Sequence, residues 1–436
     1  MNDHSAQTAQ AANSHPSLAD ILPTSIDALA SPSPPRSSHP PTSSSSLSFS
    51  KSAASGHRPR RVKRVGESKR ITASRRHLLQ SAWLLGASAT AFAAPAIAEP
   101  LPQIRWRMTS SWPKSLDALY RGAEHFAHHV AEATDNRFQI QVFAAGDLAP
   151  ALQATDAVLS GSVELGHTAS YYLWAKDPTF ALGTAVPFGL NARMQNAWWH
   201  EGGERLMNAF HSKHGLYALL AGNTGAQMGG WFRKELITVD DLKGIRMRIG
   251  GFAASVISRV GMLPEEMVGA DIYAALQKGI IDAAEWVGPY DDEKLGLYKV
   301  ARFYYYPGWW EGGAMIHIHV NREKWEALPK TYKSTLLAAA AAAHNAMLAH
   351  YDAQNPHALR RLIAAGAHLR PFSEAILDTF FKAANEVYAD MSGKNDDFRR
   401  IWDSIKAFRH DQYEWLQVAE STYDNYMMIQ QRKKTI

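Results

Sequence analysis

The chain has 436 residues, 46% of them hydrophobic, a length that suits two packed lobes better than one. Its net charge of +5 arises near the N-terminus, because residues 1–98 hold 11 of the 46 basic residues but only 4 of the 41 acidic ones. The remaining 35 basic and 37 acidic residues lack the cation excess of a nucleic-acid-binding protein, and the absence of cysteine excludes disulfides, thiolate metal sites and a cysteine nucleophile.

The first 98 residues are predicted to be an export leader. Residues 1–73 are rich in Ser, Pro, Ala and Arg without periodicity, which indicates disorder. The segment Arg-Arg-His-Leu-Leu at 75–79 then precedes an apolar run at 82–94, a pattern typical of a twin-arginine signal peptide. This run is too short and too rich in small residues to span ~30 Å of hydrocarbon, so cleavage after Ala98 is favoured over a membrane anchor. The processed protein is therefore expected in the periplasm.

The body of the chain alternates predicted strands with predicted helices. Apolar residues recur with a period of two in the strands and near 3.6 in the helices. Alternation at this spacing favours βαβ units and a largely parallel sheet. Predicted strands cover 103–110, 138–143, 163–167, 216–221 and 228–232, of which the last two flank a turn at 222–225, and predicted helices cover 116–134, 151–160 and 191–214.

The stretch from Asp240 to Trp286 places two charged groups at strand ends. Apolar residues alternate with Arg246 and Arg248, so a strand ends at Arg248, just before a helix predicted at 252–260. Ligands of open α/β sheets bind beyond the carboxyl ends of strands, where helix N–H groups also attract anions. A second predicted strand ends at Glu285 and Trp286, after a helix that Asp271 is predicted to cap. This sheet edge therefore predicts a site for a small organic acid, with a cation as a candidate bridge.

The chain becomes predominantly helical after Glu311. Residues 332–355 are rich in alanine and other strong helix formers. Asn395 is predicted to cap a further helix running to about Gln431, which would be ~55 Å long. That length exceeds what one lobe needs, and two possibilities remain open: the apolar face of this helix packs on its own chain or on a second protomer.

Several segments together resemble the periplasmic solute-binding subunits of tripartite ATP-independent (TRAP) transporters, over nearly all of residues 101–430. The resemblance rests on the leader, on Leu-Lys-Gly-Ile-Arg-Met-Arg at 242–248, on the run at 276–285 and on the helical tail. Within that family, the segments at 222–232, 285–290 and 308–313 look most like the branch that binds 2-oxo acids with a metal ion.

The resemblance implies an α/β fold of the periplasmic-binding-protein type, in which two lobes joined by hinge strands close around a ligand. Residues 99–220 are then expected to form mainly lobe 1, and residues 221–325 mainly lobe 2 with hinge crossings. Residues 326–436 are expected to return to the lobes as a helical region, and its long C-terminal helix is a candidate for homodimerisation.

The resemblance also implies roles for particular residues. Arg248 is expected to hold the substrate carboxylate, since a guanidinium can donate two parallel hydrogen bonds. Hydrogen bonds from Asn223 and from Tyr171 or Tyr172 are expected, with Trp286 or Phe188 closing an apolar side of the pocket. Carboxylate and carbonyl oxygens suit a hard cation, sodium or calcium, and the implied ligands are Gln227, Glu285, the Trp286 carbonyl and Glu311.

The function implied is that of a receptor and not an enzyme: it captures a 2-oxo acid such as pyruvate, or a 2-hydroxy acid such as lactate, and delivers it to the TRAP permease. An aromatic carboxylate or a polyol is the alternative ligand. The alternative of another class is a metal-dependent hydrolase or lyase that uses Glu285 and Glu311. Against it, the chain has no nucleophile elbow, no His-Glu-x-x-His and no phosphate loop. His317 and His319 share a strand face that would suit zinc, but without a convincing third ligand we interpret them as structural.

Overall fold

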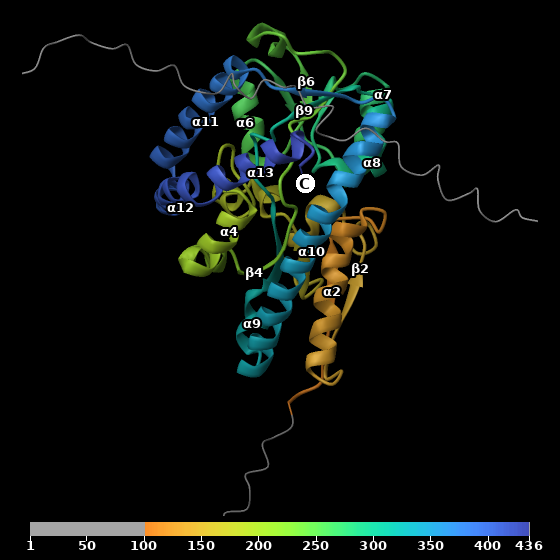
Figure 1. Ribbon diagram of the computed structural model, residues 1–436. Helices are drawn as coiled ribbons and strands as arrows, with labels where there is room; N and C mark the ends of the chain where they lie inside the picture. Colours follow the sequence, from red (N-terminus) through yellow and green to blue (C-terminus); the bar gives the residue numbers. More distant parts are fainter. Residues whose placement is uncertain (1–100, 436) are drawn as a thin grey trace, which may run out of the picture. The chain divides into compact units, whose positions relative to one another are not determined.

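The computed structural model of the protein describes residues 101–435, in which two β-sheets are covered by helices (Figure 1). The predicted export leader, its twin-arginine motif and the cleavage after Ala98 lie outside the described residues. Among the described helices, none combines the length and the hydropathy that crossing a membrane requires.

The first sheet has the order β2-β1-β3-β10-β4. Its strands are β1 (Ile104–Ser110), β2 (Phe138–Phe143), β3 (Leu165–Thr168), β4 (Leu216–Asn223) and β10 (Met315–Asn321). β1 runs parallel to β2 and β3, as the predicted βαβ units require, whereas β10 runs antiparallel to β3 and β4. All of β3 is buried, because it lies in the middle of a sheet that packs against helices.

The second sheet has the order β11-β9-β5-β8-β6-β7. Its strands are β5 (Gly230–Phe232), β6 (Arg246–Arg248), β7 (Leu263–Glu265), β8 (Ala283–Ala284), β9 (Phe303–Tyr306) and β11 (His368–Pro371). β6 lies parallel between β7 and β8, whereas β5 lies antiparallel between β8 and β9. Both sheets are therefore mixed: β10 in the first and β5 in the second run opposite to the other strands, which are parallel to one another as predicted.

Amphipathic helices cover the two sheets. α2 buries the apolar face that the sequence predicts, including Leu119, Phe126 and Val130, and it packs against β2 and α10. The helices are α2 (Asp117–Ala133), α3 (Ala154–Leu159), α4 (Ala192–Trp198), α5 (Glu204–Lys213), α6 (Gly251–Arg259), α7 (Gly269–Gln277), α8 (Pro289–Leu295), α9 (Arg322–Ala327), α10 (Lys330–Ala364), α11 (Glu374–Lys394), α12 (Asp396–Leu416) and α13 (Thr422–Arg432).

Within residues 101–435, three connections join the two sheets. Residues 224–229 lead from β4 to β5, residues 307–314 lead from β9 back to β10, and α10 leads to β11. Figure 1 shows α10 passing α2 and then α8, and it packs against both. The structure therefore confirms the predicted α/β fold with two lobes and hinge segments. We call the lobe around the first sheet lobe 1 and the lobe around the second sheet lobe 2.

Several predicted boundaries were wrong. The turn predicted at 222–225 is not a local one, because β4 continues to Asn223 and the segment after it crosses from lobe 1 to lobe 2. The helix predicted at 191–214 is interrupted by a π-helical turn at Trp199–Gly203, where Gly202 has a φ of 136°. Asp271 lies in the first turn of α7 and does not cap it. The C-terminal helix capped by Asn395, by contrast, runs to Arg432 as predicted, and it includes a second π-helical turn at Gln417–Ser421.

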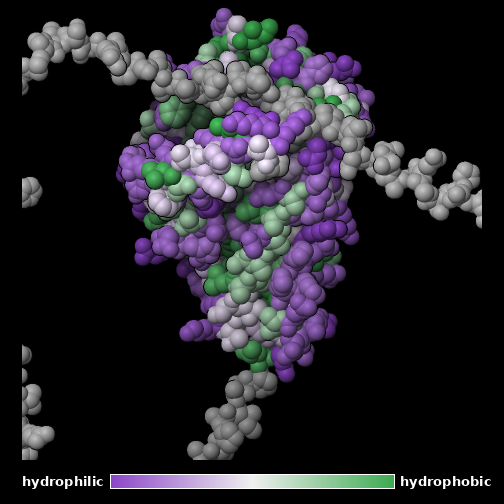
Figure 2. Space-filling view, in the orientation of Figure 1, coloured by the Kyte–Doolittle hydropathy of each residue, from purple (hydrophilic) through white to green (hydrophobic). Residues whose placement is uncertain are grey.

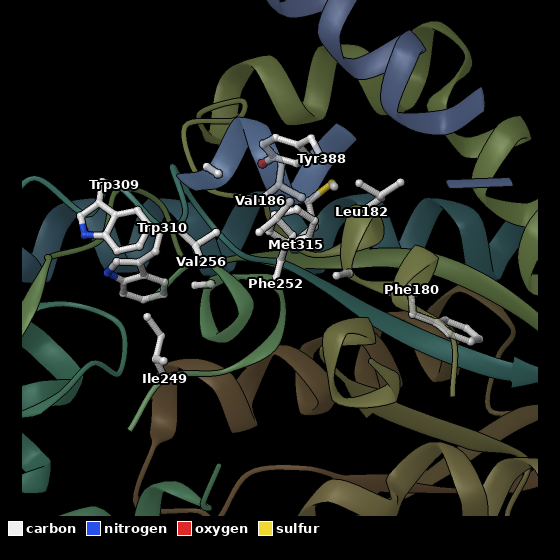
Figure 3. Packing of buried hydrophobic residues seen from close by; sticks show 14 of the residues in the cluster. Phe180, Leu182, Val186, Ile249, Phe252, Val256, Trp309, Trp310, Met315 and Tyr388 are labelled. Atoms are coloured by element: carbon white, nitrogen blue, oxygen red, sulfur yellow. The ribbon is translucent and has the colours of Figure 1, made fainter. Parts of the chain in front are cut away.

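A hydrophobic cluster joins residues of both lobes with α11 and α12. Figure 3 shows Trp309 and Trp310 close to Val256 and Ile249 within this cluster. The Trp309 ring stacks on Phe380 with their centroids 4.1 Å apart. These two tryptophans of the Gly-rich crossing segment are therefore part of the core.

In the described part of the chain, five histidines are buried: His167, His211, His317, His319 and His344. Burial lowers the pKa of each of them, to about 3 for His167 and about 4 for His211. The rings of His317 and His319 lie beside His211, and the Ser170 hydroxyl contacts both of them. These neutral imidazoles act as polar core residues of lobe 1.

The buried His167 predicts a loss of stability in mild acid. Burial lowers its pKa to about 3, against 6.5 in the unfolded chain, so unfolding takes up a proton below pH 6.5. The stabilisation that comes from keeping His167 neutral is therefore fully present above pH 6.5. As the pH falls to 5, the free energy of unfolding decreases by about 2 kcal/mol. We expect the fall in unfolding free energy between pH 7 and pH 5, measured with urea, to be about 2 kcal/mol smaller in His167→Gln than in the wild type. Equal falls in both proteins would contradict this expectation.

Candidate functional site

Two neighbouring parallel strands bring Arg248 and Glu285 together. β6 ends at Arg248, β8 ends one residue before Glu285, and the register places Arg248 opposite Ala284. Arg248 Nη1 donates to the main-chain oxygen of Glu285 at 2.8 Å and forms an ion pair with its carboxylate. Arg248 Nε donates to the main-chain oxygen of Met267 at 3.2 Å. The predicted juxtaposition of these two residues at one sheet edge is therefore what the structure contains.

This ion pair is almost fully shielded from water. Arg248 and Glu285 are each 2% exposed, and the Trp286 ring lies 4.9 Å from the guanidinium carbon. Burial raises the pKa of the Glu285 carboxyl to about 7, although Arg248 and the Gly250 N–H favour the charged form. A buried charge without a partner is strongly disfavoured, so either group needs a replacement partner before it can leave the other.

A small cavity lies next to this pair, between the two lobes. Lobe 1 lines it mainly with apolar side chains, lobe 2 contributes Trp286 and Val287, and the crossing segments contribute Thr224, Gln227 and Glu311. The space that the centres of water molecules can occupy in it is about 20 Å³. This is room for one or two waters. The lobes are thus closed over the site. The lobe 1 lining consists of Trp112, Leu119, Ala169, Tyr171, Tyr172, Ala314 and Ile316.

Oxygen atoms of Gln227 and Glu311 gather at the polar side of this cavity. Glu311 is 4% exposed, and burial together with the Glu285 charge raises the pKa of its carboxyl well above the usual value. Gln227 Nε2 donates to Thr224 Oγ1 at 2.7 Å, which leaves its Oε1 buried without a hydrogen-bond partner. An unpaired amide oxygen beside two buried carboxylates fits the donor set of a hard cation.

Both candidate tyrosines line the cavity. The rings of Tyr171 and Tyr172 meet edge to face with centroids 4.8 Å apart, and burial raises the pKa of both hydroxyls. They are therefore neutral donors. Tyr171 also packs against the start of α6, where a Cβ on Gly250 or Gly251 would lie 3.0 Å from its side chain. Glycines at the Arg248 strand end thus let lobe 2 approach this part of lobe 1.

Four predicted site residues do not line the cavity: Arg248 and Glu285, whose ion pair lies behind Trp286, and Asn223 and Phe188, which are committed to other contacts. Asn223 is fully buried, where it donates to Gln195 Oε1 at 2.8 Å and accepts from the Gly225 N–H at 2.9 Å. The Phe188 ring packs on Trp309 with centroids 5.7 Å apart and contacts Phe381 edge to face. Asn223 thus shapes the first crossing segment, and Phe188 extends the core.

Sequence reasoning missed the apolar wall of the cavity. Trp112 follows β1 at the carboxyl end of the first sheet, so the strand-end argument that selected Arg248 would also have selected Trp112. Leu119 on α2 and Ile316 on β10 carry no such signal, because their periodicity is that of ordinary core residues. They become site residues only because the second lobe closes over them.

Within residues 101–435, two α/β lobes, three crossing segments and a small cavity between the lobes with an apolar and a polar side define the class of periplasmic-type solute receptors. The family model for bacterial extracellular solute-binding proteins, family 7, matches residues 109–395. The chain therefore belongs to this family of TRAP transporter solute-binding proteins, whose members are extracytoplasmic receptors and not enzymes.

Particular relatives agree with this assignment. A monocarboxylate 2-oxoacid-binding periplasmic protein of Nostoc sp. is 48% identical over 75% of this chain and 90% of its own length. The crystal structure of a TRAP solute-binding protein from Bordetella bronchiseptica, a dimer with calcium and picolinate, is 45% identical with a TM-score of 0.75, over 76% of this chain and 99% of that one. A Pseudoalteromonas atlantica protein with bound sodium and pyruvate is 34% identical with a TM-score of 0.72, over 74% and 99%.

Proposed function

We propose that this receptor captures a small 2-oxo monocarboxylate such as pyruvate, together with a cation, and delivers it to the permease of a TRAP transporter. The observation that carries the proposal is the buried Arg248–Glu285 pair beside Glu311 and the unpaired Gln227 Oε1. The relatives support the ligand class, since the Nostoc protein is named for 2-oxo acids and the Pseudoalteromonas structure holds pyruvate.

Ligand binding in this proposal is an exchange of partners. The ligand carboxylate takes the place of Glu285 on Arg248, and Glu285 joins Glu311, Gln227 Oε1 and the Trp286 carbonyl as ligands of the cation. The carboxylate and 2-oxo oxygens of the ligand complete its coordination. The tyrosine pair is placed to donate hydrogen bonds to the ligand, with the Trp286 ring as an apolar cover. No bond of the ligand is broken, so the site binds without turnover.

The buried charges favour calcium over sodium. Arg248 contributes one positive charge, while Glu285, Glu311 and the ligand carboxylate contribute three negative ones. A divalent cation neutralises the remaining two negative charges, whereas a monovalent cation leaves one of them buried without compensation. Calcium is accordingly the cation that we propose.

Calorimetry on the processed protein tests this function. We expect pyruvate to bind in the presence of calcium, to bind more weakly with sodium alone, and to lose binding when EDTA removes the metal. Lactate, benzoate and sorbitol serve as the competing 2-hydroxy, aromatic and polyol ligands. Tight binding of benzoate or sorbitol without binding of pyruvate would contradict the proposal, and so would disappearance of the pyruvate signals during NMR observation.

The position of the Trp286 ring predicts that a substitution at Gly269, 17 residues earlier in the sequence, affects ligand binding. A Cβ on Gly269 at the start of α7 would lie 2.7 Å from this ring, closer than real contacts allow. We therefore expect Gly269→Ala to displace the indole and to weaken pyruvate binding by about tenfold. The matched control is Gly393→Ala in α11, where a Cβ meets nothing within 4 Å. Calorimetry on both variants checks this, and equal affinities would show that the indole does not cover the ligand.

A homodimer through the C-terminal helix is the second part of the proposal. In the described part of the chain, α13 has no buried residue, although its exposed side chains include Tyr423, Tyr426 and Ile429. α10 also carries an exposed apolar stripe around Leu337 and Ala341, visible as a pale green band in Figure 2. Two uncovered apolar surfaces on one chain fit reciprocal burial in a twofold dimer.

Charge placed on α13 tests the dimer. We expect the wild type to have twice the chain mass by light scattering, and Tyr423→Lys with Tyr426→Lys to have the mass of a single chain. Ile237→Lys on lobe 2, where Ile237 is 75% exposed, is the control and is expected to remain dimeric. A dimeric double variant would place the interface elsewhere.

A further inference from the structure

A cluster of three side chains joins the two lobes outside the cavity. Asp117 lies in the first turn of α2 in lobe 1, while Tyr290 and Lys294 lie on α8 in lobe 2. The Tyr290 hydroxyl donates to Asp117 Oδ2 at 3.1 Å, and Lys294 Nζ forms an ion pair with Asp117 Oδ1. Lys294 Nζ also lies 3.4 Å from the centre of the Tyr290 ring. One carboxylate of lobe 1 thus accepts two hydrogen bonds from lobe 2.

The hinge helix α10 holds this cluster in position. The main-chain N–H of Tyr290 donates to Asn355 Oδ1 at 3.0 Å, and His350 Nε2 lies 3.3 Å from the Tyr290 hydroxyl. Both partners belong to α10, which packs against α8 and passes it in Figure 1. The donors on α8 are therefore held by α10 as well as by Asp117, which reduces the entropy lost when the cluster forms.

Asp117 is ionised and partly shielded from water. Burial acts to raise its pKa, but the bonds from Lys294 and Tyr290 outweigh it, so that the pKa lies below the usual value. The side chains of Asp117 and Lys294 are each 27% exposed, less than those of most ion pairs on this surface. Partial burial and a shared acceptor make such a pair stronger than an isolated exposed one.

The cluster is placed to report on closure of the cavity. Asp117 lies between Trp112 and Leu119, which both line the cavity, and Tyr290 follows the cavity residues Trp286 and Val287 on the lobe 2 side. Neither Asp117 nor Lys294 lines the cavity itself. In the closed arrangement, the cluster therefore joins the two segments that carry opposite walls of the cavity.

We propose that Asp117, Tyr290 and Lys294 form a latch that stabilises the closed receptor and slows release of the ligand. The predicted effect on ligand release rests on the proposed function, because it assumes that the receptor closes around a solute. Asp117 is a positioning residue: it acts through the lobe arrangement and does not touch the ligand. Breaking the latch shifts the equilibrium toward the open form, from which the ligand escapes.

The test compares Asp117→Asn, Lys294→Gln and the double variant with the wild type. Asparagine keeps the shape of Asp117 and an acceptor for Tyr290, but it removes the charge. With calcium present, stopped-flow measurements of pyruvate are expected to show dissociation about fivefold faster in each single variant, with little change in the association rate. The double variant is expected to be no faster than the single ones, because both substitutions remove the same pair.

Two controls separate the latch from a general effect of charge or stability. Asp156→Asn with Lys176→Gln removes an ion pair of the same type within lobe 1 and is expected to leave dissociation unchanged. Unfolding by urea is expected to be similar in all of these variants. An equal increase in the Asp156 and Asp117 variants would overturn the latch.

A measurement without ligand keeps the latch testable if the proposed ligand is wrong. Because the chain has no cysteine, Leu159→Cys in lobe 1 and Ile280→Cys in lobe 2 provide two unique and exposed sites for spin labels. In the ligand-free protein, electron–electron distance distributions are expected to show a smaller closed population in Asp117→Asn than in the wild type. Equal populations would overturn the latch, whereas failure of the wild type to bind pyruvate would overturn only the proposed ligand.

Discussion

Replacing Arg248 by alanine is expected to lower the affinity for pyruvate by at least about a hundredfold, because the variant loses a charge-assisted bidentate contact in a buried site. Arg248 is 2% exposed, so water cannot take its place beside the ligand carboxylate. Calorimetry with calcium present measures the effect. The fold is expected to persist, because the pKa of the Glu285 carboxyl is already raised to about 7 and the group can stay protonated when its partner is removed.

The same strand provides a matched control. Arg246 lies two residues earlier on β6 and pairs with Asp282, but its side chain is 40% exposed, whereas that of Arg248 is 2% exposed. Arg246→Ala is expected to bind pyruvate with nearly the affinity of the wild type. If Arg248→Ala proves unstable, Arg248→Met keeps the apolar bulk of the side chain, removes the charge and preserves the test. Affinity retained in Arg248→Ala would show that another group receives the carboxylate.

The placement of Arg248 and Glu285 at one sheet edge was predictable because it depends on short-range sequence patterns, whereas their direct ion pair was not predicted. Alternating residues define β6, Gly250 and Gly251 end it, and parallel neighbours place their carboxyl ends at one edge. The same reasoning found α2 by its apolar period and the start of α12 by Asn395, whose side chain accepts from the Phe398 N–H. Such signals are contained within single elements and need no knowledge of the other lobe.

The remainder of the site depends on contacts between segments far apart in the sequence. A local turn was predicted at 222–225, but residues 224–229 form a segment that crosses from lobe 1 to lobe 2. That crossing commits Asn223 to hydrogen bonds within its own segment, while it brings Gln227 to the cavity. Phe188 is an aromatic residue that could form an apolar pocket wall, but its ring packs beside Trp309. Local pattern cannot distinguish these outcomes, because both positions call for a buried residue.

The shape of the closed cavity also could not be predicted from local sequence patterns. The polar groups of the pocket come from the crossing segments and from the tyrosine pair of lobe 1, and its apolar wall combines residues of α2 and β10 in lobe 1 with Trp286 and Val287 of lobe 2. Each surface alone resembles the ordinary edge of a sheet or helix. Their combination leaves a cavity that is apolar on one side and charged on the other, which suits a short carboxylic acid with an apolar end.

The cation site predicts the second large effect. Glu285→Gln is expected to weaken calcium binding by at least about a hundredfold, which is the upper end of what changes in outer-shell partners cost, because it removes a direct carboxylate ligand. Metal content measured by mass spectrometry and calcium titration by calorimetry are the readouts. Glu265→Gln, an exposed carboxylate opposite Arg248 on the neighbouring strand β7, is the control and is expected to retain calcium.

The decisive measurement on the Glu285 variant is the coupling between its affinities for calcium and for pyruvate. If pyruvate completes the coordination of the cation, calcium must raise the affinity for pyruvate by the same factor as pyruvate raises the affinity for calcium. In Glu285→Gln both factors are expected to fall together, because the cation that links the ligands is held less tightly. Loss of calcium with unchanged binding of pyruvate would separate the two sites and leave Arg248 alone as the ligand anchor. Unchanged calcium binding would instead place the cation away from Glu285.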